Sequence, residues 1–369
     1  MSARLEDSFL ASVIDDKRLY LERPRIDALL EKALESPVLL VSAGEGYGKT
    51  HAVFSFLRRL GAKGSGNELI RISLSERDND PSHFWESVVM AVGHRDPRAK
   101  KALEDIGFPE SRNQINRCFS ILSKAGAGGK KHIIAADDCH LIREGPIQKF
   151  IMQLFTFPLP NERFILISRT ESIFNLMPLL SKGLLSRITA EDLRFSKEEI
   201  SGYFRLRDIP LPEKECDEIL ADTEGWALAI SLLTEEMKSG NKNYHRSLLE
   251  SGNFRAMEDE MFASMPAPLQ RFLIIISIFE EWPVEVLRRV AASMPEKLPA
   301  AEELAKHLNR LSSFLRYDAY INGFRIHRLF LDYLREKQKS LSHKEKTTAC
   351  SIKALWCMEN NLRINAATY

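Results

Sequence analysis

The chain has 369 residues, of which 44% are hydrophobic and 28% charged, and its 52 basic and 51 acidic residues leave a formal net charge of +1. This composition is ordinary for a globular protein, and the length is enough for about two or three domains that each bury a core. Nucleic-acid-binding domains usually carry a strong basic excess, so the near-neutral balance gives no support to a dedicated DNA- or RNA-binding protein.

The cysteines and the N-terminus indicate a cytoplasmic protein. The five cysteines form no CxxC pair, and an odd, scattered set argues against both a disulfide framework and a zinc site. The first residues lack the basic and then apolar layout of a signal peptide. The longest apolar run, 272–279, is too short to cross a bilayer, so we expect no contact with a membrane.

The first half of the chain alternates short apolar runs with amphipathic stretches, which is typical of a parallel sheet with helices on both faces. Uninterrupted apolar runs suit strands that are covered on both sides. The predicted strands are Val38–Ser42, Leu69–Leu74, His132–Ala136 and Arg163–Ser168. The predicted helices are 52–60, 82–92 and 113–123, with a surface loop at 124–131.

After about residue 188 the strand pattern fades and helices dominate. Ser196 and Glu199 form a capping box that opens one helix. Helical patterns continue as far as Gly240–Asn243, which looks like a linker.

A second helical block, 258–307, ends in a hairpin candidate made of 314–317 and 323–327. The hairpin turns at Asn322 and Gly323, a pair that favours tight turns. The block is interrupted at Pro266, Pro268 and Pro283. Helices followed by one hairpin are typical of a winged-helix domain.

The strongest motif, Ala43-Gly-Glu-Gly-Tyr-Gly-Lys-Thr50, follows the first predicted strand and opens a helix, as in a phosphate-binding loop. Small residues let backbone N–H groups wrap phosphates at a helix N-terminus. Lys49 is expected to reach the β- and γ-phosphates, and the Thr50 hydroxyl to ligate Mg²⁺. A carboxylate would repel a triphosphate, so we expect Glu45 to point outward. The predicted nucleotide contacts here are Ala43, Gly44, Gly46, Tyr47, Gly48, Lys49 and Thr50.

The third predicted strand ends in two carboxylates, Asp137 and Asp138. A P-loop ATPase needs one acid at this place to hold Mg²⁺ and another to orient the attacking water. Asp137 fits the first role and Asp138 the second. A strand that ends in two aspartates is often only a solvated turn, and it is the phosphate-binding loop before it that favours the catalytic interpretation.

Arg169 follows the fourth predicted strand, where a P-loop ATPase can place a sensor of the γ-phosphate. Position alone leaves this role and that of an ordinary surface arginine equally open. Cys139 and His140 follow the two aspartates, but without a second ligand pair nearby they fit helix-start packing better than a metal site.

Together these residues resemble a known family, the MalT-like large ATP-binding LuxR-type transcriptional regulators, which belong to the STAND class of signal-transducing P-loop ATPases. The similar segments cover nearly the whole chain. Gly46–Thr50 resembles the family's phosphate loop with its tyrosine, Asp137–Ile142 its Asp-Asp-x-His pattern, and Ile167–Arg169 its sensor strand.

Weaker similarities extend the resemblance toward both ends. The segment 21–30 is similar to the one before the family's first strand, which implies a nucleotide contact for Arg23. The segment 223–229 resembles a helical-domain signature, with Ala227 where the wider class often has proline. The segment 325–330 resembles a winged-helix motif whose histidine approaches the β-phosphate of ADP, which implies that role for His327, although a lone histidine on a helix is more often packed or solvated.

The resemblance also implies a domain organisation. The expected segments are an N-terminal arm at 1–20, a P-loop NTPase domain at 21–192, a helical lid at 193–250, a winged-helix domain at 251–343 and the start of a helical-repeat region at 344–369. Full members of the family continue with a repeat sensor and a DNA-binding helix-turn-helix. We therefore expect an inducer, a small molecule or a protein, to act through repeats absent from this chain, and DNA to be contacted only through a domain absent from it.

The function that the resemblance implies is a two-state switch that binds ATP or ADP with Mg²⁺. ADP held between the P-loop sheet and the winged helix would lock a closed monomer, and ATP together with an inducer would favour an open, self-associating form. Lys49, Asp138 and Arg169 are the expected catalytic residues of an ATP hydrolysis that is at most slow and resets the switch.

Two alternatives remain open at this point. One is a mechanical ATPase of the AAA+ or origin-recognition kind, which also joins a lid and a winged helix. The other is a winged helix that binds DNA directly through Arg325 and Arg328 beside a vestigial ATPase. The near-neutral charge argues against the second.

Overall fold

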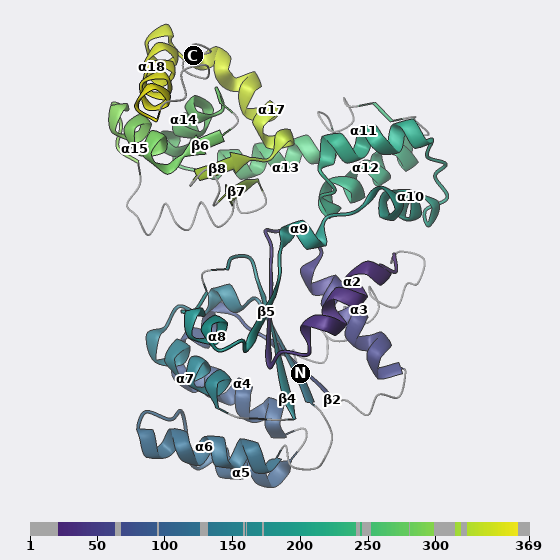
Figure 1. Ribbon diagram of the computed structural model, residues 1–369, viewed down its shortest axis with the longest axis vertical. Helices are drawn as coiled ribbons and strands as arrows, with labels where there is room; N and C mark the ends of the chain where they lie inside the picture. The colour runs from purple at the N-terminus through teal and green to yellow at the C-terminus, as the bar shows by residue number, and fades with distance from the viewer. Residues whose placement is uncertain are drawn as a thin grey trace. The chain divides into compact units, whose positions relative to one another are not determined.

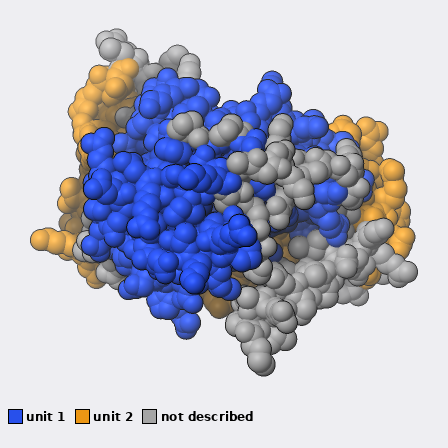
Figure 2. Space-filling model, turned by 90° about the horizontal axis from the view of Figure 1, so that it is seen from below, with its two compact units in different colours: residues 1–17, 22–193 blue, residues 18–21, 194–369 orange. Residues whose placement is uncertain are grey.

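The computed structural model describes residues 21–62, 68–93, 96–125, 132–157, 159, 161–171, 173–240, 244–245, 252–279, 281–298, 314–318 and 323–360. The chain divides into two compact units, residues 1–17 with 22–193 and residues 18–21 with 194–369, coloured separately in Figure 2. The expected arm at 1–20 lies outside the described residues. So do most of the predicted surface loop and linker, the end of the second helical block and the last residues of the chain.

The first unit is built on a five-stranded sheet in the order β2-β3-β4-β1-β5, in which every pairing is parallel. The strands are β1 (Val38–Ser42), β2 (Glu68–Ser73), β3 (His132–Asp137), β4 (Glu162–Ser168) and β5 (Leu185–Ile188). The four predicted strands and the α/β fold are confirmed. The sequence did not predict β5, because this short edge strand has two more exposed polar residues, Ser186 and Arg187, between its buried ends and so forms no apolar run.

Helices cover both faces of this sheet, with α2 and α3 on one side and α4 to α7 on the other (Figure 1). The helices are α2 (Pro24–Ala33), α3 (Lys49–Ala62), α4 (Pro81–Gly93), α5 (Pro97–Glu104), α6 (Arg112–Ala125), α7 (Gly145–Thr156), α8 (Met177–Ser181) and α9 (Ala190–Leu193), with short 3₁₀ turns at Glu76–Asn79 and Cys139–Leu141. The three helices predicted in this half are confirmed within α3, α4 and α6. Two-sided cover explains why all five residues of β1 are buried.

An aromatic cluster fills the space beneath the α4–α7 face. Phe150 of α7 contacts Phe84 and Trp85 of α4, with ring centroids 6.4 and 5.6 Å away, and Phe119 of α6 at 5.8 Å. Each of these four side chains is at most 5% exposed. Burial of such large apolar side chains supplies much of the free energy that holds the helices on the sheet.

The second unit begins with three helices and continues into a winged-helix arrangement. Its elements are α10 (Lys197–Arg205), α11 (Glu213–Thr223), α12 (Ala227–Gly240), α13 (Gly252–Ala263), α14 (Ala267–Ile276), β6 (Glu281–Pro283), α15 (Val284–Ser293), β7 (Leu315–Asp318), β8 (Gly323–Ile326), α17 (Arg328–Lys337), a 3₁₀ turn at Gln338–Ser340 and α18 (His343–Glu359). The predicted capping box is present, because Ser196 and Glu199 exchange side-chain and backbone hydrogen bonds at the start of α10. Pro266 and Pro283 stand at the N-caps of α14 and α15, so these predicted interruptions are confirmed.

The predicted hairpin is confirmed as the antiparallel pair β7–β8, and β6 adds a third strand on the other side of β8. Gly323 is needed at the β6–β8 pairing, since a Cβ there would lie 2.2 Å from the carbonyl oxygen of Trp282. The sequence did not predict β6, a three-residue strand between two helices. Asn322, the other half of the expected turn, lies outside the described residues.

The C-terminal helix α18 is tied to the winged-helix core. Arg271 of α14 donates from Nε and Nη2 to the two carboxylate oxygens of Glu345, at 2.7 and 2.6 Å. Bidentate pairs of this kind fix geometry as well as adding energy. Within the described part of the chain, no helix has the length and apolar character needed to span a membrane.

A glycine substitution tests the turn between α11 and α12. Gly225 has φ +73°, its carbonyl accepts from the Phe195 N–H at 2.8 Å, and a Cβ would lie 2.5 Å from the Phe195 carbonyl oxygen. We expect Gly225→Ala to lower the free energy of unfolding by about 2–4 kcal/mol, since it adds a clash to an unfavourable backbone conformation. Chemical denaturation would measure the loss. Gly61→Ala in α3, where an added Cβ meets nothing within 4 Å, should instead stabilise the protein by up to about 1 kcal/mol. An unchanged Gly225→Ala protein would refute this account of the turn.

A buried carboxyl group in the second unit makes its stability depend on pH. Glu258 on α13 is 2% exposed, and within the described part of the chain its Oε1 has no hydrogen-bond partner. Burial raises the pKa of Glu258 to about 8; Arg255 opposes the rise, and Asp259, Glu336 and Asp332 add to it. The folded state therefore favours the protonated acid.

The stability that Glu258 contributes is complete below its ordinary pKa of 4.5 and is lost as the pH rises toward 8. We expect the free energy of unfolding of Glu258→Gln to equal that of the wild type near pH 4.5. At about pH 9 it should exceed the wild-type value by roughly 1–3 kcal/mol. Denaturation at both pH values would measure this difference. Glu260→Gln, at an exposed position of the same helix, is the matched control and should show none. Parallel pH profiles for wild type and Glu258→Gln would contradict the prediction.

Candidate functional site

The phosphate-binding loop spans residues 43–48, between the end of β1 and the start of α3. Gly46 and Gly48 have φ angles of 76° and 73°, in the left-handed region that favours glycine. The Ala43 N–H donates to the Ser168 carbonyl at 3.3 Å, so this group extends the sheet and does not face the loop. Of the other predicted contacts, Tyr47 has a buried side chain, which leaves its backbone N–H as the group that could reach a phosphate.

Lys49 lies across this loop. Its Nζ donates to the Gly44 carbonyl at 2.7 Å, which closes the loop on itself. Burial, followed by the charge of the nearby Arg169, lowers the pKa of Lys49 to about 8, while Asp137 is the largest of the acids that oppose the shift. Two cationic side chains held this close together disfavour each other, and an anion placed between them would relieve the repulsion.

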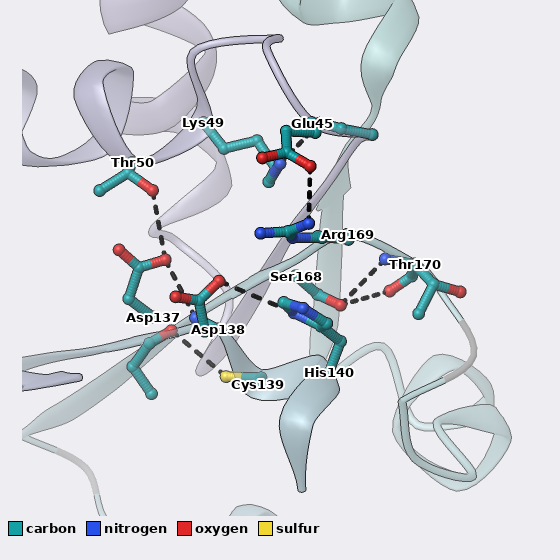
Figure 3. Close-up of polar contacts among 12 residues, drawn as sticks. Glu45, Lys49, Thr50, Asp137, Asp138, Cys139, His140, Ser168, Arg169 and Thr170 are labelled. Carbon is teal, nitrogen blue, oxygen red and sulfur yellow. Dashed lines mark hydrogen bonds and ion pairs between the residues drawn. The ribbon is translucent and has the colours of Figure 1, made fainter. Parts of the chain in front are cut away.

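The two carboxylates at the end of β3 lie beside the start of α3 (Figure 3). The Thr50 hydroxyl donates to Asp137 Oδ1 at 3.2 Å, and the same oxygen accepts from the Asp138 N–H at 3.0 Å. Asp137 is 6% exposed, and burial followed by the charge of Asp138 raises its pKa, against the effect of these two hydrogen bonds. Thr50 and Asp137, which the sequence assigned separately to Mg²⁺, thus lie within hydrogen-bonding distance of each other, and their role toward the metal stays a prediction.

Asp138 differs from its neighbour in backbone and in exposure. Its φ and ψ are 55° and 36°, a left-handed conformation that is uncommon outside glycine and often marks functional positions. Its side chain is half exposed, and Oδ1 lies 3.8 Å from Nδ1 of His140. The Asp138 carboxylate is therefore far more exposed than that of Asp137 and lies near His140.

Cys139 and His140 pack at the start of the following 3₁₀ turn, as the sequence predicted. The Cys139 thiol is buried, donates to the Ala136 carbonyl at 3.2 Å, and has its pKa raised by burial. Burial likewise lowers the pKa of His140. Among the described residues, no group of three or more His, Cys, Asp or Glu side chains could hold a metal ion by itself.

Arg169 comes directly after β4, and its Nη1 lies 2.7 Å from Oε2 of Glu45 in the phosphate-binding loop. The expectation that Glu45 points outward was incomplete. Its side chain is 58% exposed, but its carboxylate is turned toward Arg169 (Figure 3). Sequence reasoning missed this pair, because neither residue's neighbours in the chain indicate the other.

The structure places Arg23 and His327 in packing contacts. Arg23 at the N-cap of α2 is 5% exposed and donates to the Leu193 carbonyl at 2.9 Å. His327 at the N-cap of α17 is 7% exposed, with Nε2 3.2 Å from the Thr223 carbonyl and Nδ1 accepting from the Leu329 N–H at 3.3 Å. Burial lowers the pKa of His327, which favours the neutral imidazole. Contact of either residue with a nucleotide stays a prediction.

The donor set suits a magnesium–polyphosphate ligand. A hydroxyl and a carboxylate that meet at 3.2 Å, Thr50 and Asp137, are hard oxygen ligands, and Mg²⁺ usually takes one or two such protein groups together with phosphate oxygens. Lys49 and Arg169 supply positive charge on the same edge of the sheet. The start of α3, at Lys49, adds backbone N–H groups and the positive end of a helix dipole.

Comparisons with known proteins agree with this architecture. Residues 258–346 match the family model of the MalT winged helix domain. The chain is 24% identical over 325 residues to the HTH-type transcriptional regulator MalT of Klebsiella pneumoniae subsp. pneumoniae, and 22% identical over 324 residues to that of Serratia proteamaculans. Each match covers 85% of this chain and 35% of the relative, so the chain spans about a third of the length of these regulators.

A solved structure with a similar fold is the Walker-type ATPase PABY2304 of Pyrococcus abyssi. It superposes with a TM-score of 0.55 at 16% identity, covering 86% of this chain and 96% of its own. At this identity the likeness concerns the fold. A P-loop NTPase sheet and a winged helix that matches the MalT model thus occur in the order predicted from the sequence. Over the part that it shares with these regulators, the chain is therefore similar to MalT, and its first unit has the fold of a P-loop NTPase.

Proposed function

We propose that this chain is the adenine-nucleotide-controlled switch of a MalT-like transcriptional regulator. The observation that carries the proposal is the convergence of Lys49, the Thr50–Asp137 pair and Arg169 at the edge of one sheet. These are the three kinds of group that a bound nucleoside triphosphate needs: a cation for its phosphates, oxygen ligands for its metal, and a contact that depends on the γ-phosphate.

Nucleotide binding would begin with an exchange of hydrogen-bond partners. Lys49 leaves the Gly44 carbonyl and donates to phosphate oxygens, while the N–H groups of Gly46 to Lys49 turn toward the phosphates at the start of α3. Thr50 and Asp137 would hold Mg²⁺. The metal, when bound, would supply positive charge that neutralises the phosphates.

Hydrolysis, at most slow, would rely on Asp138. Its left-handed backbone and half-exposed carboxylate suit it to accept a hydrogen bond from a water molecule in line with the γ-phosphate. Arg169 would stabilise charge on the γ-phosphate, as Arg and Lys groups do in phosphoryl transfer. Loss of the γ-phosphate then removes the contact that distinguishes the two nucleotide states.

The switch itself requires that ATP and ADP have different affinities for two conformations. A γ-phosphate contact to Arg169 would provide that difference within the first unit. We further propose that the ATP state self-associates, that ADP holds a closed state with the help of His327, and that an inducer acts through repeats in the longer regulators. DNA contact belongs to a domain outside this chain.

The first test is to purify the chain, denature it and identify any released adenine nucleotide. We expect near-stoichiometric ADP or ATP from the wild type and none from Lys49→Ala, because the cation that faces the phosphates is lost. ADP would favour a locked resting state. If the wild type releases nothing, Mg-ATP at about a hundred times its Kd should still stabilise it by about 2.7 kcal/mol in thermal melts. No release and no stabilisation would overturn the proposal.

Removing the second aspartate separates binding from hydrolysis. We expect Asp138→Asn to bind Mg-ATP within a few-fold of the wild type but to hydrolyse it about 10²- to 10⁴-fold more slowly in single-turnover assays, because it loses the group that orients water. Asp137→Asn should instead weaken the Mg²⁺ dependence of ATP binding. Equal hydrolysis by Asp138→Asn and wild type would remove Asp138 from the mechanism.

A further inference from the structure

The phosphate-binding loop of this chain carries its own anion at the site. Glu45, the third residue of the loop motif, places its carboxylate 2.7 Å from the guanidinium of Arg169. The contact is held by the sheet, because β1 and β4 pair in register from Val38 with Phe164 to Ser42 with Ser168. The residues that follow these ends, the loop and Arg169, therefore start side by side.

This arrangement gives Arg169 a carboxylate partner, Glu45, from within the protein. The same guanidinium is the group expected to contact a γ-phosphate, and a guanidinium that pairs with one anion has fewer donors for another. A carboxylate on the loop also lies close to where phosphate charge would gather, and charges of like sign repel each other there. ADP lacks the γ-phosphate and so leaves the Glu45–Arg169 pair undisturbed.

We propose that Glu45 is a specificity-determining residue of the nucleotide site, an internal substitute for the γ-phosphate that lowers affinity for ATP relative to ADP. The inference rests on the proposed function and adds to it the means by which the resting state is biased. ATP must displace Glu45 from Arg169 to gain the same contact, whereas ADP binds beside an intact pair. Glu45 thereby sets how much ATP is needed to reach the active state.

The test compares affinities for ADP and for the β,γ-imido analogue of ATP, both with Mg²⁺, by calorimetry. We expect Glu45→Gln to raise the affinity for the analogue about three- to tenfold relative to ADP, a size consistent with a partly exposed ion pair. The effect should shrink as salt is raised, because charges this exposed are screened. A change of loop shape alone would not show this salt dependence.

Two further variants identify the cause. Glu171, two residues after Arg169 in the chain, pairs with Arg187 at 3.3 Å. Glu171→Gln removes the same charge as Glu45→Gln and should leave the ratio of the two affinities unchanged. Arg169→Gln should weaken binding of the ATP analogue but not binding of ADP. In that background Glu45→Gln should have a clearly smaller effect than in the wild type, as a double-mutant cycle requires of two residues that act through one contact.

The outcomes separate this inference from the function on which it rests. If the wild type binds both nucleotides and Glu45→Gln leaves their ratio unchanged, only the role of Glu45 is overturned. If Glu45→Gln selectively weakens binding of the analogue, then Glu45 positions Arg169 for the γ-phosphate. In that case Glu45 raises the affinity for ATP, and the proposed direction of its effect is wrong. If the wild type binds neither nucleotide, the proposed function and this inference fall together.

Discussion

The candidate site depends on one constraint, the parallel pairing of β3, β4 and β1. Parallel strands end at the same edge of a sheet, and ligands of open α/β sheets bind at the carboxyl ends of the strands. The pairing of Ala136 with Leu166 and of Ser42 with Ser168 brings three chain segments to that edge. The phosphate-binding loop, the two aspartates and Arg169 follow these strands, so the register determines which side chains can act together.

The polar groups at that edge carry charges of both signs. Lys49 is half-buried near a second cation and uses a loop carbonyl as a partner, while Asp137 is buried beside a second carboxylate. A magnesium–polyphosphate complex carries both signs of charge and complements both halves. Glu45 interrupts this pattern, because it offers Arg169 a carboxylate from within the loop. Under the proposed function, the loop would therefore contain an element that opposes binding of ATP.

The second unit shows how a motif residue can serve the fold. Both ring nitrogens of His327 engage protein groups, the Thr223 carbonyl at the end of α11 and the Leu329 N–H of α17. The ring also lies 5.4 Å from that of Trp226, which is 1% exposed. This contact joins the end of the helical segment to the winged helix. A nucleotide contact by His327 would therefore require one ring nitrogen to exchange its partner.

The sequence by itself determined the α/β fold, the phosphate-binding loop and the winged helix, because apolar runs, glycine spacing and turn residues are local patterns that report on the backbone around them. Only the tertiary structure revealed β5 and β6, strands of four and three residues that exist through their neighbours. It also decided the Glu45–Arg169 pair and the His327–Thr223 contact, which join residues 124 and 104 positions apart. Such contacts follow from strand register and helix packing, and no local pattern in the chain encodes them.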